Sequence, residues 1–306
     1  MNFQQLRIVR ETVRQNFNLT ETGKALFTSQ SGISKGLKEL EDELGVEIFS
    51  RFGKRLVGLT EAGGDLLKVV DRILLDAENI KRMALQFSGR KKGNLTVATT
   101  HTQARYVLPT VIQRFMLDVP EVHLFLHQGS PKEIVKLLLS GDADIGIATE
   151  TLAQIPDLIS FPCYEWEHGV IVPRDHPLLA LEKVTLEDLS KFPVITYHPS
   201  FTGRSHVDHA FRQADLEPDI VITAMDADVI KTYVSLGLGI GIVSSLAFSP
   251  ERDTSLALIP AGHLFGSNFA RIAVRRGHYL RGYAYDFIQR LAPELTESAL
   301  KPKIYV

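Results

Sequence analysis

The sequence predicts an α/β protein preceded by a small, mainly helical domain and one long helix. Three observations support this fold class. Residues 1–58 show short amphipathic helices and then a strand pair, residues 60–88 keep one helical repeat throughout, and strands alternate with helices from residue 95 onward. Because this alternation occurs in two separate stretches, we expect two similar lobes with a cleft between them.

Length and composition are those of a soluble protein with two or three domains. The 306 residues are 44% hydrophobic and 23% charged, with a formal net charge of −2, so any contact with nucleic acid has to be local. The single cysteine, Cys163, excludes a disulfide framework and a Cys-cluster metal site, and we expect a packed thiol at the hinge between the lobes. No secretory signal or bilayer-spanning apolar run is visible, which predicts a cytoplasmic protein without membrane contact.

Residues 1–58 predict three short helices and a hairpin. The second helix is expected at about 20–27, with Thr20 as its N-cap, and the third starts within residues 28–32 and stops at Gly45. Two strand-like runs on either side of residues 52–54 indicate the hairpin. The apolar positions that define the first and third helices are Leu6, Val9, Val13, Ile33, Leu37, Leu40 and Leu44.

Polar and basic residues gather at the start of the third helix and on the hairpin. A helix-turn-helix places the first residues of its second helix against base edges in the major groove, where glutamine can pair with adenine. Residues 1–60 hold nine basic and seven acidic side chains, so positive charge is focused rather than large, and on charge alone a partnerless amphipathic helix stays open. With the turn and the hairpin, residues 1–59 predict a winged helix-turn-helix for double-stranded promoter or operator DNA. Its candidate contacts are Thr28, Ser29, Gln30, Ser31, Ser34, Lys35, Lys38, Arg51, Lys54 and Arg55.

The long helix predicted over 60–88 carries an apolar seam with alternating steps of four and three residues. That spacing is the 3.5-residue repeat of a coiled coil, which an ordinary surface helix imitates only over shorter stretches. We therefore predict a linker helix that dimerises the chain, followed by a polar boundary segment at 88–94. The seam comprises Leu66, Val70, Ile73, Ala77, Ile80, Ala84 and Phe87.

The remainder, 89–306, predicts a two-lobed effector domain of the periplasmic-binding-protein type. Lobe I is expected at about 93–162 and 268–306, and lobe II at about 163–267, joined through an irregular stretch at 160–170. Parallel strands with helical crossovers are expected in both lobes. The predicted strands are 95–99, 122–128, 143–149, 194–198, 219–224 and 239–245, and the predicted helices are 103–117, 131–140, 204–214 and 227–236.

Small polar residues stand where predicted strands end and helices begin. In open α/β sheets ligands bind at the carboxyl ends of strands, and helix N-termini favour anions. Each threonine taken singly is better explained as a helix cap, but several sites converge at one edge. We therefore predict a pocket for a small anion, held by neutral donors, that contains Thr100, Thr102, Gln103, Ser130, Thr149 and Thr202.

Other motifs do not indicate a cofactor, metal or catalytic site. The glycines of 237–241 follow a helix and enter a strand, the reverse of a dinucleotide-binding loop, and the histidines lack metal-ligand spacing. Asp226 and Asp228 resemble an acid pair, but capping of the helix at 227–236 accounts for them better. No catalytic constellation stands out, so we expect no enzyme, no cofactor and no metal.

The N-terminal sixty residues resemble the LysR-type transcriptional regulators. The resemblance rests on Ser29-Gln30-Ser31-Gly32-Ile33-Ser34, Leu40-Glu41, Leu44-Gly45, Phe49, Arg51 and Leu59-Thr60-Glu61-Ala62-Gly63. Ser31 and Gly32 depart from the proline and alanine usual in that family, and Gly36 lies inside the third helix at a cost of about 1 kcal/mol in helix propensity.

The C-terminal part resembles the CysB-like branch of that family, the regulators of sulfur assimilation. The matching segments are 99–106, 127–131, 148–150, 201–205 and 226–233. The resemblance implies control of sulfur and cysteine metabolism genes and an effector such as sulfate, thiosulfate or O- or N-acetylserine. It also implies a homotetramer built as a dimer of dimers, with RNA polymerase as a further partner. The alternative, a transport-type solute-binding protein for an oxyanion, leaves residues 1–90 unexplained.

Overall fold

The computed structural model describes residues 1–53, 55–87 and 92–305, and for Thr202 it describes the backbone only. The chain divides into two compact units, Met1–Leu85 and Gln86–Val306. The division falls just before the polar segment 88–94, and the first unit includes both the region of residues 1–59 and most of the long helix. Across the described residues, no helix is long and apolar enough to cross a membrane.

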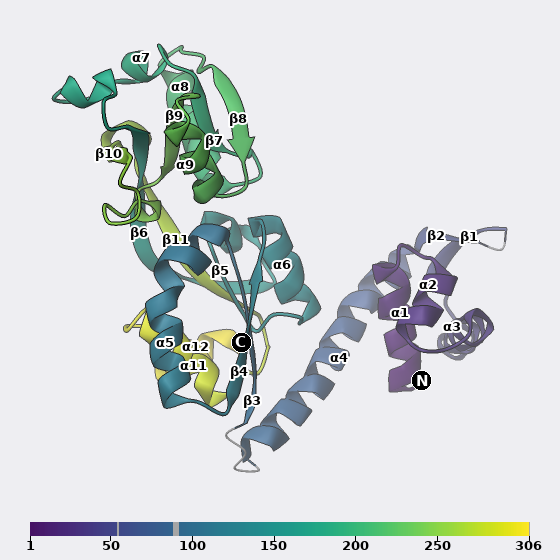
Figure 1. The fold of residues 1–306 in the computed structure, drawn as a ribbon. Helices are drawn as coiled ribbons and strands as arrows, with labels where there is room; N and C mark the ends of the chain where they lie inside the picture. The colour runs from purple at the N-terminus through teal and green to yellow at the C-terminus, as the bar shows by residue number, and fades with distance from the viewer. Residues whose placement is uncertain (54, 88–91, 306) are drawn as a thin grey trace. The chain divides into compact units, whose positions relative to one another are not determined.

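The first unit is a three-helix domain with a two-stranded hairpin, followed by the long helix (Figure 1). The third helix has the predicted ends: the Ser29 hydroxyl accepts from the Gly32 amide at 3.1 Å, and Gly45 ends the helix in the left-handed conformation, at φ 70°. The elements are α1 (Phe3–Arg14), α2 (Leu19–Ala25), α3 (Gln30–Leu44), β1 (Phe49–Phe52), β2 (Arg55–Leu59) and α4 (Glu61–Phe87).

The second helix begins earlier than predicted. Asn18, not Thr20, is its N-cap, and the Asn18 side chain accepts from the amides of Thr20 and Glu21. Asparagine is at least as good an N-cap as threonine, and the prediction of Thr20 as the N-cap is wrong. Phe27, placed in this helix by the sequence, lies beyond its end with φ 52° and its side chain exposed.

The core of the first unit is formed where α1, α3 and the hairpin meet. Ile33, Leu37 and Leu40 of α3 are almost fully buried against Ile8 and Val9 of α1. Gly36 belongs to this contact, because a Cβ on Gly36 would lie 2.8 Å from Ile8 Cδ1. The lack of a side chain at Gly36 therefore allows α1 and α3 to approach each other closely, at the cost of helix propensity.

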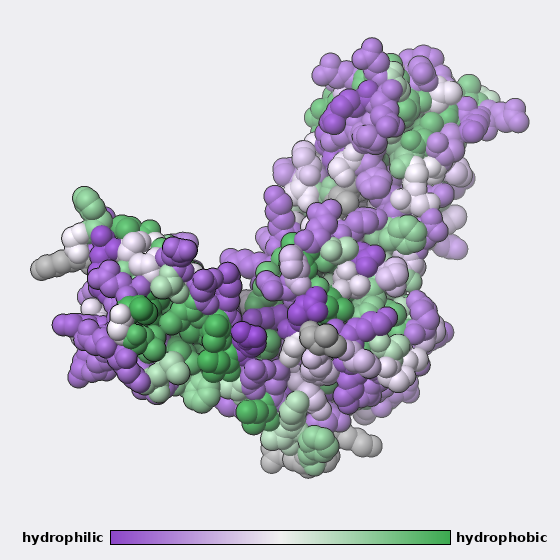
Figure 2. Space-filling model, turned by 180° about the vertical axis from the view of Figure 1, so that it is seen from behind, coloured by the Kyte–Doolittle hydropathy of each residue, from purple (hydrophilic) through white to green (hydrophobic). Residues whose placement is uncertain are grey.

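The predicted seam of α4 divides into two halves. Leu66, Val70 and Ile73 pack near Leu6 of α1, so this half contributes to the core of its own unit. Further along, Ile80 is 67% exposed and Phe87 is 85% exposed. Figure 2 shows apolar side chains gathered on the first unit where α1 and α4 lie. The second half of the seam is thus exposed on the first unit, as far as the structure describes it.

The second unit is built on one nine-stranded sheet within the described residues (Figure 1), in the order β4-β3-β5-β11-β6-β9-β7-β8, with β10 added to β6. The predicted parallel pairs are confirmed for β3 with β4 and β5, and for β7 with β8 and β9. Lobe I contains β3 (Gly93–Thr99), η1 (Gln103–Val107), α5 (Leu108–Asp118), β4 (Val122–Gln128), α6 (Pro131–Ser140), β5 (Ile145–Ala148), η2 (Glu150–Gln154), α11 (Gly282–Leu291) and α12 (Glu297–Ile304). Lobe II contains η3 (Pro177–Ala180), α7 (Leu186–Leu189), β7 (Val194–Tyr197), α8 (Thr202–Gln213), β8 (Ile220–Ala224), α9 (Ala227–Ser235), β9 (Ile240–Ser244), η4 (Ser245–Ala247), β10 (Leu256–Pro260) and α10 (Gly262–Phe265).

Two long strands connect the lobes, and here the prediction of an irregular stretch at 160–170 is wrong. That stretch lies inside β6 (Leu158–Pro173), which pairs antiparallel with β11 (Ser267–Arg275) in one part and with β9 and β10 in the other. The spacing of the buried residues in β6 is irregular along its length, because its neighbouring strands change from one lobe to the other. Simple alternation is therefore missing from its sequence.

Each lobe has helices on both faces of the sheet. In lobe I, α5, α11 and α12 cover one face and α6 covers the other. In lobe II, α7, α8 and α10 cover one face and α9 covers the other. The single helix predicted at 103–117 is instead the π-helical turn η1 followed by α5. A π-helical turn often marks a functional segment.

Candidate DNA-binding and anion-binding sites

The N-terminal turn of α3 presents the predicted polar residues to solvent. Gln30, Ser31, Ser34, Lys35 and Lys38 are exposed, while the opposite side of the helix forms the core. Thr28 is half-buried at the turn, Ser29 caps the helix, and the hydroxyls of Ser29 and Ser31 lie 3.0 Å apart. The first turn of α3 is therefore an accessible polar surface, as a recognition helix requires.

The wing is attached to α3 through Glu41. This carboxylate is 9% exposed and accepts from the backbone amides of Ile48 (2.9 Å) and Phe49 (3.2 Å). It also accepts from Arg51 Nη2 at 2.5 Å. Arg51, predicted as a DNA contact, thus forms a salt bridge within the domain that the sequence did not predict. Sequence reasoning also missed Glu41, which joins the wing to α3. Arg55 is exposed on β2, and Lys54 lies outside the described residues.

The second unit contains a pocket between its two lobes. Lobe I contributes the segment between β3 and η1, and lobe II contributes residues from β7, β9 and the start of α8. The volume is about 40 Å³, room for only a few water molecules. The lining residues are Thr100, His101, Thr102, Gln103, Pro131, Thr149, Trp166, Tyr197, Phe201, Gly203, Met225 and Ser244.

Four of the six predicted anion ligands lie in this pocket: Thr100, Thr102, Gln103 and Thr149. Tyr164 donates to Oε1 of Gln103, which leaves the amide N–H groups of Gln103 for another acceptor. The Tyr197 hydroxyl in lobe II is hydrogen-bonded to the Thr102 side chain in lobe I. Burial raises the pKa of Tyr197 to about 12, so this group stays protonated at neutral pH.

Ser130 and Thr202 differ from the other four. The Ser130 hydroxyl donates to Glu133 Oε2 at 2.8 Å and forms a capping box at the start of α6. Those hydrogen bonds from the amide and hydroxyl of Ser130 lower the pKa of Glu133. Ser130 is therefore engaged as a helix cap, the role that the sequence left open for any single residue. Thr202 opens α8 next to Gly203, and its side chain lies outside the described residues.

Lobe II supplies two donors that sequence reasoning missed. Trp166 Nε1 and Ser244 Oγ are buried without a hydrogen-bond partner among the described residues, and both residues line the pocket. Both groups can therefore donate to a molecule bound in the pocket. Ser244 ends a strand and was within reach of the strand-end rule, whereas Trp166 lies in β6, which was taken as irregular.

The pocket lining has no permanently charged side chain. Its twelve lining residues include no lysine, arginine, aspartate or glutamate, and the side chains able to donate are hydroxyls, an indole, an amide and the imidazole of His101. Behind Trp166, burial and the neighbouring His206 lower the pKa of His168 to about 4, so His168 is uncharged at neutral pH. An anion in such a site would be bound by dipoles, since the lining offers no lysine or arginine for a salt bridge.

Cys163 and the acid pair have structural surroundings. The Cys163 thiol packs against the core of lobe I, and burial, together with the charge of Glu294, raises its pKa to about 12. Asp226 caps α9 by accepting from the Val229 amide at 2.9 Å, which confirms its predicted role. Asp228 is bonded instead to residues of the other lobe. His101, Asp226 and Asp228 lie close together, but the cationic neighbours of Asp228 make this a polar cluster rather than a cation cage.

Comparison with known proteins identifies the family of both parts of the chain. The bacterial regulatory helix-turn-helix model of the lysR family matches residues 3–64, and the LysR substrate binding domain matches residues 88–296. The chain is 56% identical over 300 residues to the HTH-type transcriptional regulator SsuR of Burkholderia cenocepacia, covering 98% of this chain and 97% of that protein. It is 53% identical over 305 residues to the regulator CysB of the same organism, with coverage of 98% and 97%.

A solved structure extends the likeness to the effector domain. The crystal structure of the cofactor-binding domain of the Cbl transcriptional regulator matches with a TM-score of 0.68 and 45% identity, covering 70% of this chain and 94% of that chain. The relatives are transcriptional regulators, so the prediction that the chain is not an enzyme is confirmed, and the transport-type alternative is not favoured. The chain belongs to the LysR family of transcriptional regulators, and within it to the branch that includes SsuR, CysB and Cbl.

Proposed function

We propose that this LysR-type regulator controls genes of sulfur metabolism by binding operator DNA through α3 and the wing and a small oxyanion through the pocket between its lobes. The pocket carries the anion proposal, because the unpartnered donors of Trp166 and Ser244 face the predicted threonines across a neutral site. Donors of this kind suit a compact oxyanion such as sulfate or thiosulfate, and they would also bind the carboxylate of O- or N-acetylserine.

Replacing Gln30 with alanine is expected to weaken specific operator binding by about 1–3 kcal/mol and to leave non-specific binding nearly unchanged. The side chain is exposed at the first residue of α3, where recognition helices meet base edges. Mobility-shift titrations with upstream regions of sulfur-assimilation operons and with random DNA of equal length measure both affinities.

The matched comparison is Arg55→Ala, which removes an exposed charge from the wing. This variant should lose affinity for both DNAs alike and show a flatter salt dependence, since phosphate contacts carry no sequence information. Wild-type operator affinity in Gln30→Ala would show that α3 is not the recognition helix.

Replacing Thr100 with valine is expected to weaken sulfate or thiosulfate binding about tenfold or more. Valine keeps the side-chain shape and removes one donor, and a hydrogen bond to a charged acceptor contributes about 1.5–3 kcal/mol. Calorimetric titration of the full chain with each sodium salt, and with O- and N-acetylserine, gives the affinities and ranks the effectors.

Ser130→Ala serves as the control, because the Ser130 hydroxyl is bonded to Glu133. Its sulfate affinity should stay within about twofold of wild type, although α6 loses a cap of about 1 kcal/mol. A larger loss of sulfate affinity in Ser130→Ala than in Thr100→Val would mean that Ser130, not Thr100, binds the anion. Undiminished binding in Thr100→Val would place the effector elsewhere.

Assembly would connect the two sites. LysR regulators oligomerise, and the exposed second half of the α4 seam supports a helix–helix dimer, with two dimers forming the proposed homotetramer. Lobe closure on an anion would then change the spacing of paired DNA-binding units and so the contact with RNA polymerase. A protein with operator DNA as its partner works in the cytoplasm.

A further inference from the structure

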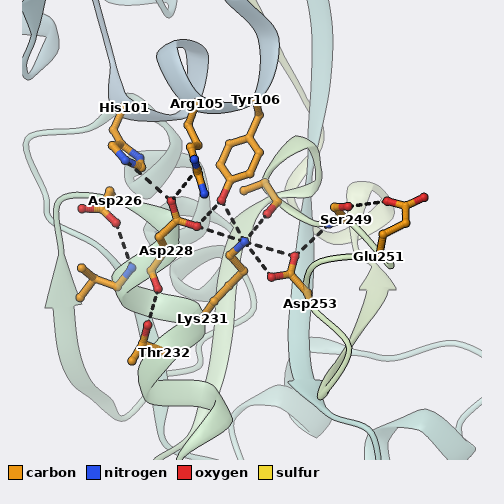
Figure 3. Close-up of polar contacts among 12 residues, drawn as sticks. His101, Arg105, Tyr106, Asp226, Asp228, Lys231, Thr232, Ser249, Glu251 and Asp253 are labelled. Carbon is orange, nitrogen blue, oxygen red and sulfur yellow. Dashed lines mark hydrogen bonds and ion pairs between the residues drawn. The ribbon is translucent and has the colours of Figure 1, made fainter. Parts of the chain in front are cut away.

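A second set of polar contacts joins the lobes beside the anion pocket (Figure 3). The Tyr106 hydroxyl of lobe I donates to Asp228 Oδ1 of lobe II at 2.5 Å. Arg105 Nε lies 3.4 Å from the other oxygen of Asp228, and His101 Nε2 lies 3.8 Å from it. The Asp228 carboxylate, at the start of α9, thus interacts with three side chains of the other lobe.

Lys231 holds this carboxylate and the tyrosine from within lobe II. Its ammonium group is within 3.2 Å of Asp228 and donates to the Tyr106 hydroxyl at 2.9 Å. The same group donates to the Ala247 carbonyl at 2.9 Å and to Asp253 at 3.0 Å. Only the contact with Tyr106 crosses to lobe I. Lys231, itself 7% exposed, would therefore remain paired if the lobes separated.

The charge states favour a closed arrangement. Burial raises the pKa of Asp228, but hydrogen bonds from Tyr106 and Lys231 and the charges of Lys231 and Arg105 outweigh it, so the net pKa is lowered. Burial lowers the pKa of Lys231, and its bonds to Tyr106, Asp253 and Asp228 outweigh that effect, so the net pKa is raised. At neutral pH an ionised carboxylate therefore meets an ammonium and a neutral phenol.

The pocket and these contacts share one short segment. The π-helical turn η1 carries both Gln103, which lines the pocket, and Tyr106, whose ring packs against the core of lobe II. His101, just before η1, lines the pocket and reaches Asp228 as well. A shift of η1 caused by an anion would consequently move Tyr106 relative to Asp228.

We infer that Asp228, Lys231 and Tyr106 form a latch that holds the two lobes closed and so sets the fraction of molecules ready to bind the anion. The inference rests on the proposed anion pocket, which it deepens. Asp228 acts as a positioning residue, because it lies outside the pocket lining and acts through η1. An apparent dissociation constant rises when the binding-competent fraction falls.

The latch and simple electrostatics predict opposite results. Replacing a carboxylate close to an anion site by an amide removes a repulsive charge and should by itself tighten anion binding. For Asp228→Asn we expect sulfate binding to weaken about three- to tenfold, because the latch is lost. Asp226→Asn removes the same charge two residues away, and the Asp226 side chain is bonded to the Val229 amide of its own lobe, so its sulfate affinity should be unchanged or slightly higher.

A second variant tests the latch without a change of charge. Tyr106→Phe removes the hydroxyl and keeps the ring that packs in lobe II. It should weaken sulfate binding about as much as Asp228→Asn. The double variant should bind about as weakly as either single one, because both remove the same bond. Additive losses would mean that the two residues act separately, and the latch would be disproved.

A distance measurement tests the latch without any anion. Spin labels at Lys132→Cys in α6 and His209→Cys in α8, both exposed, span the pocket in a Cys163→Ala background, with labelled chains diluted in unlabelled protein. In sulfate-free buffer Asp228→Asn and Tyr106→Phe should shift the distance distribution to longer values, while Asp226→Asn should match the parent. Wild-type distances in both latch variants would overturn the inference. If the parent binds no sulfate, the anion proposal fails, and this distance result still decides the latch.

Discussion

Replacing Glu41 with alanine is expected to lower the free energy of unfolding of the DNA-binding unit by about 3–5 kcal/mol. The substitution leaves the buried amides of Ile48 and Phe49 without an acceptor and releases Arg51 of the wing. The unique tryptophan, Trp166, lies in the other unit, so fluorescence would not report the change. Amide hydrogen exchange over α3, β1 and β2 in the full chain measures it directly.

Glu39→Ala is the matched control on the same helix. Glu39 is exposed and pairs with Lys35 at 3.7 Å, one helical turn away. Such surface pairs contribute about 0.3–0.5 kcal/mol, so protection should hardly change. Equal effects of the two substitutions would mean that Glu41 does not join the wing to the recognition helix.

Replacing Gly63 with alanine is expected to destabilise the same unit by about 3 kcal/mol, at the upper end of the cost of overpacking. A Cβ at Gly63 would lie 1.9 Å from the backbone oxygen of Ile48, a contact that requires the start of α4 to move. The Ile48 oxygen also accepts from the Thr60 amide at 3.0 Å, so this movement would disturb the entry to the helix.

Replacing the neighbouring Gly64 with alanine should instead stabilise the unit. A Cβ at Gly64 meets nothing within 4 Å, and alanine is a better helix former than glycine by about 1 kcal/mol. Hydrogen exchange should therefore show faster exchange near α4 in Gly63→Ala and slower exchange in Gly64→Ala. A stabilised Gly63→Ala would contradict the close approach of α4 to residue 48.

Local patterns in the sequence were sufficient for most elements. The spacing of Ile33, Leu37 and Leu40, with Ser29 before the helix and Gly45 after it, predicts α3 because capping and helical periodicity act within a few residues. The strand-end rule brought Thr100, Thr102, Gln103 and Thr149 to one pocket for the same reason, since parallel strands all end at one edge of the sheet.

Sequence reasoning was misled where a residue has two suitable roles. Ser130 can cap α6 or donate to a ligand, and the choice depends on Glu133 three residues later, which accepts its hydrogen bond. Asn18 and Thr20 are both good caps, and only the path of the chain into α2 selects the first. Asp228 was read as a second cap, although three of its partners, Tyr106, Arg105 and His101, are 122 to 127 residues away in the other lobe.

The sequence by itself determined the family signature, the alternation of helices and strands up to residue 245 apart from β6, and the ends of α3, because these depend on neighbours along the chain. Only the tertiary structure decided that β6 and β11 connect the lobes, that Trp166 and Ser244 complete the pocket, and that Glu41 joins the wing to α3. Each of these features depends on contacts between distant segments. Burial, hydrogen bonding and charge pairing at such contacts are set by the packing of the whole unit, which no local pattern contains.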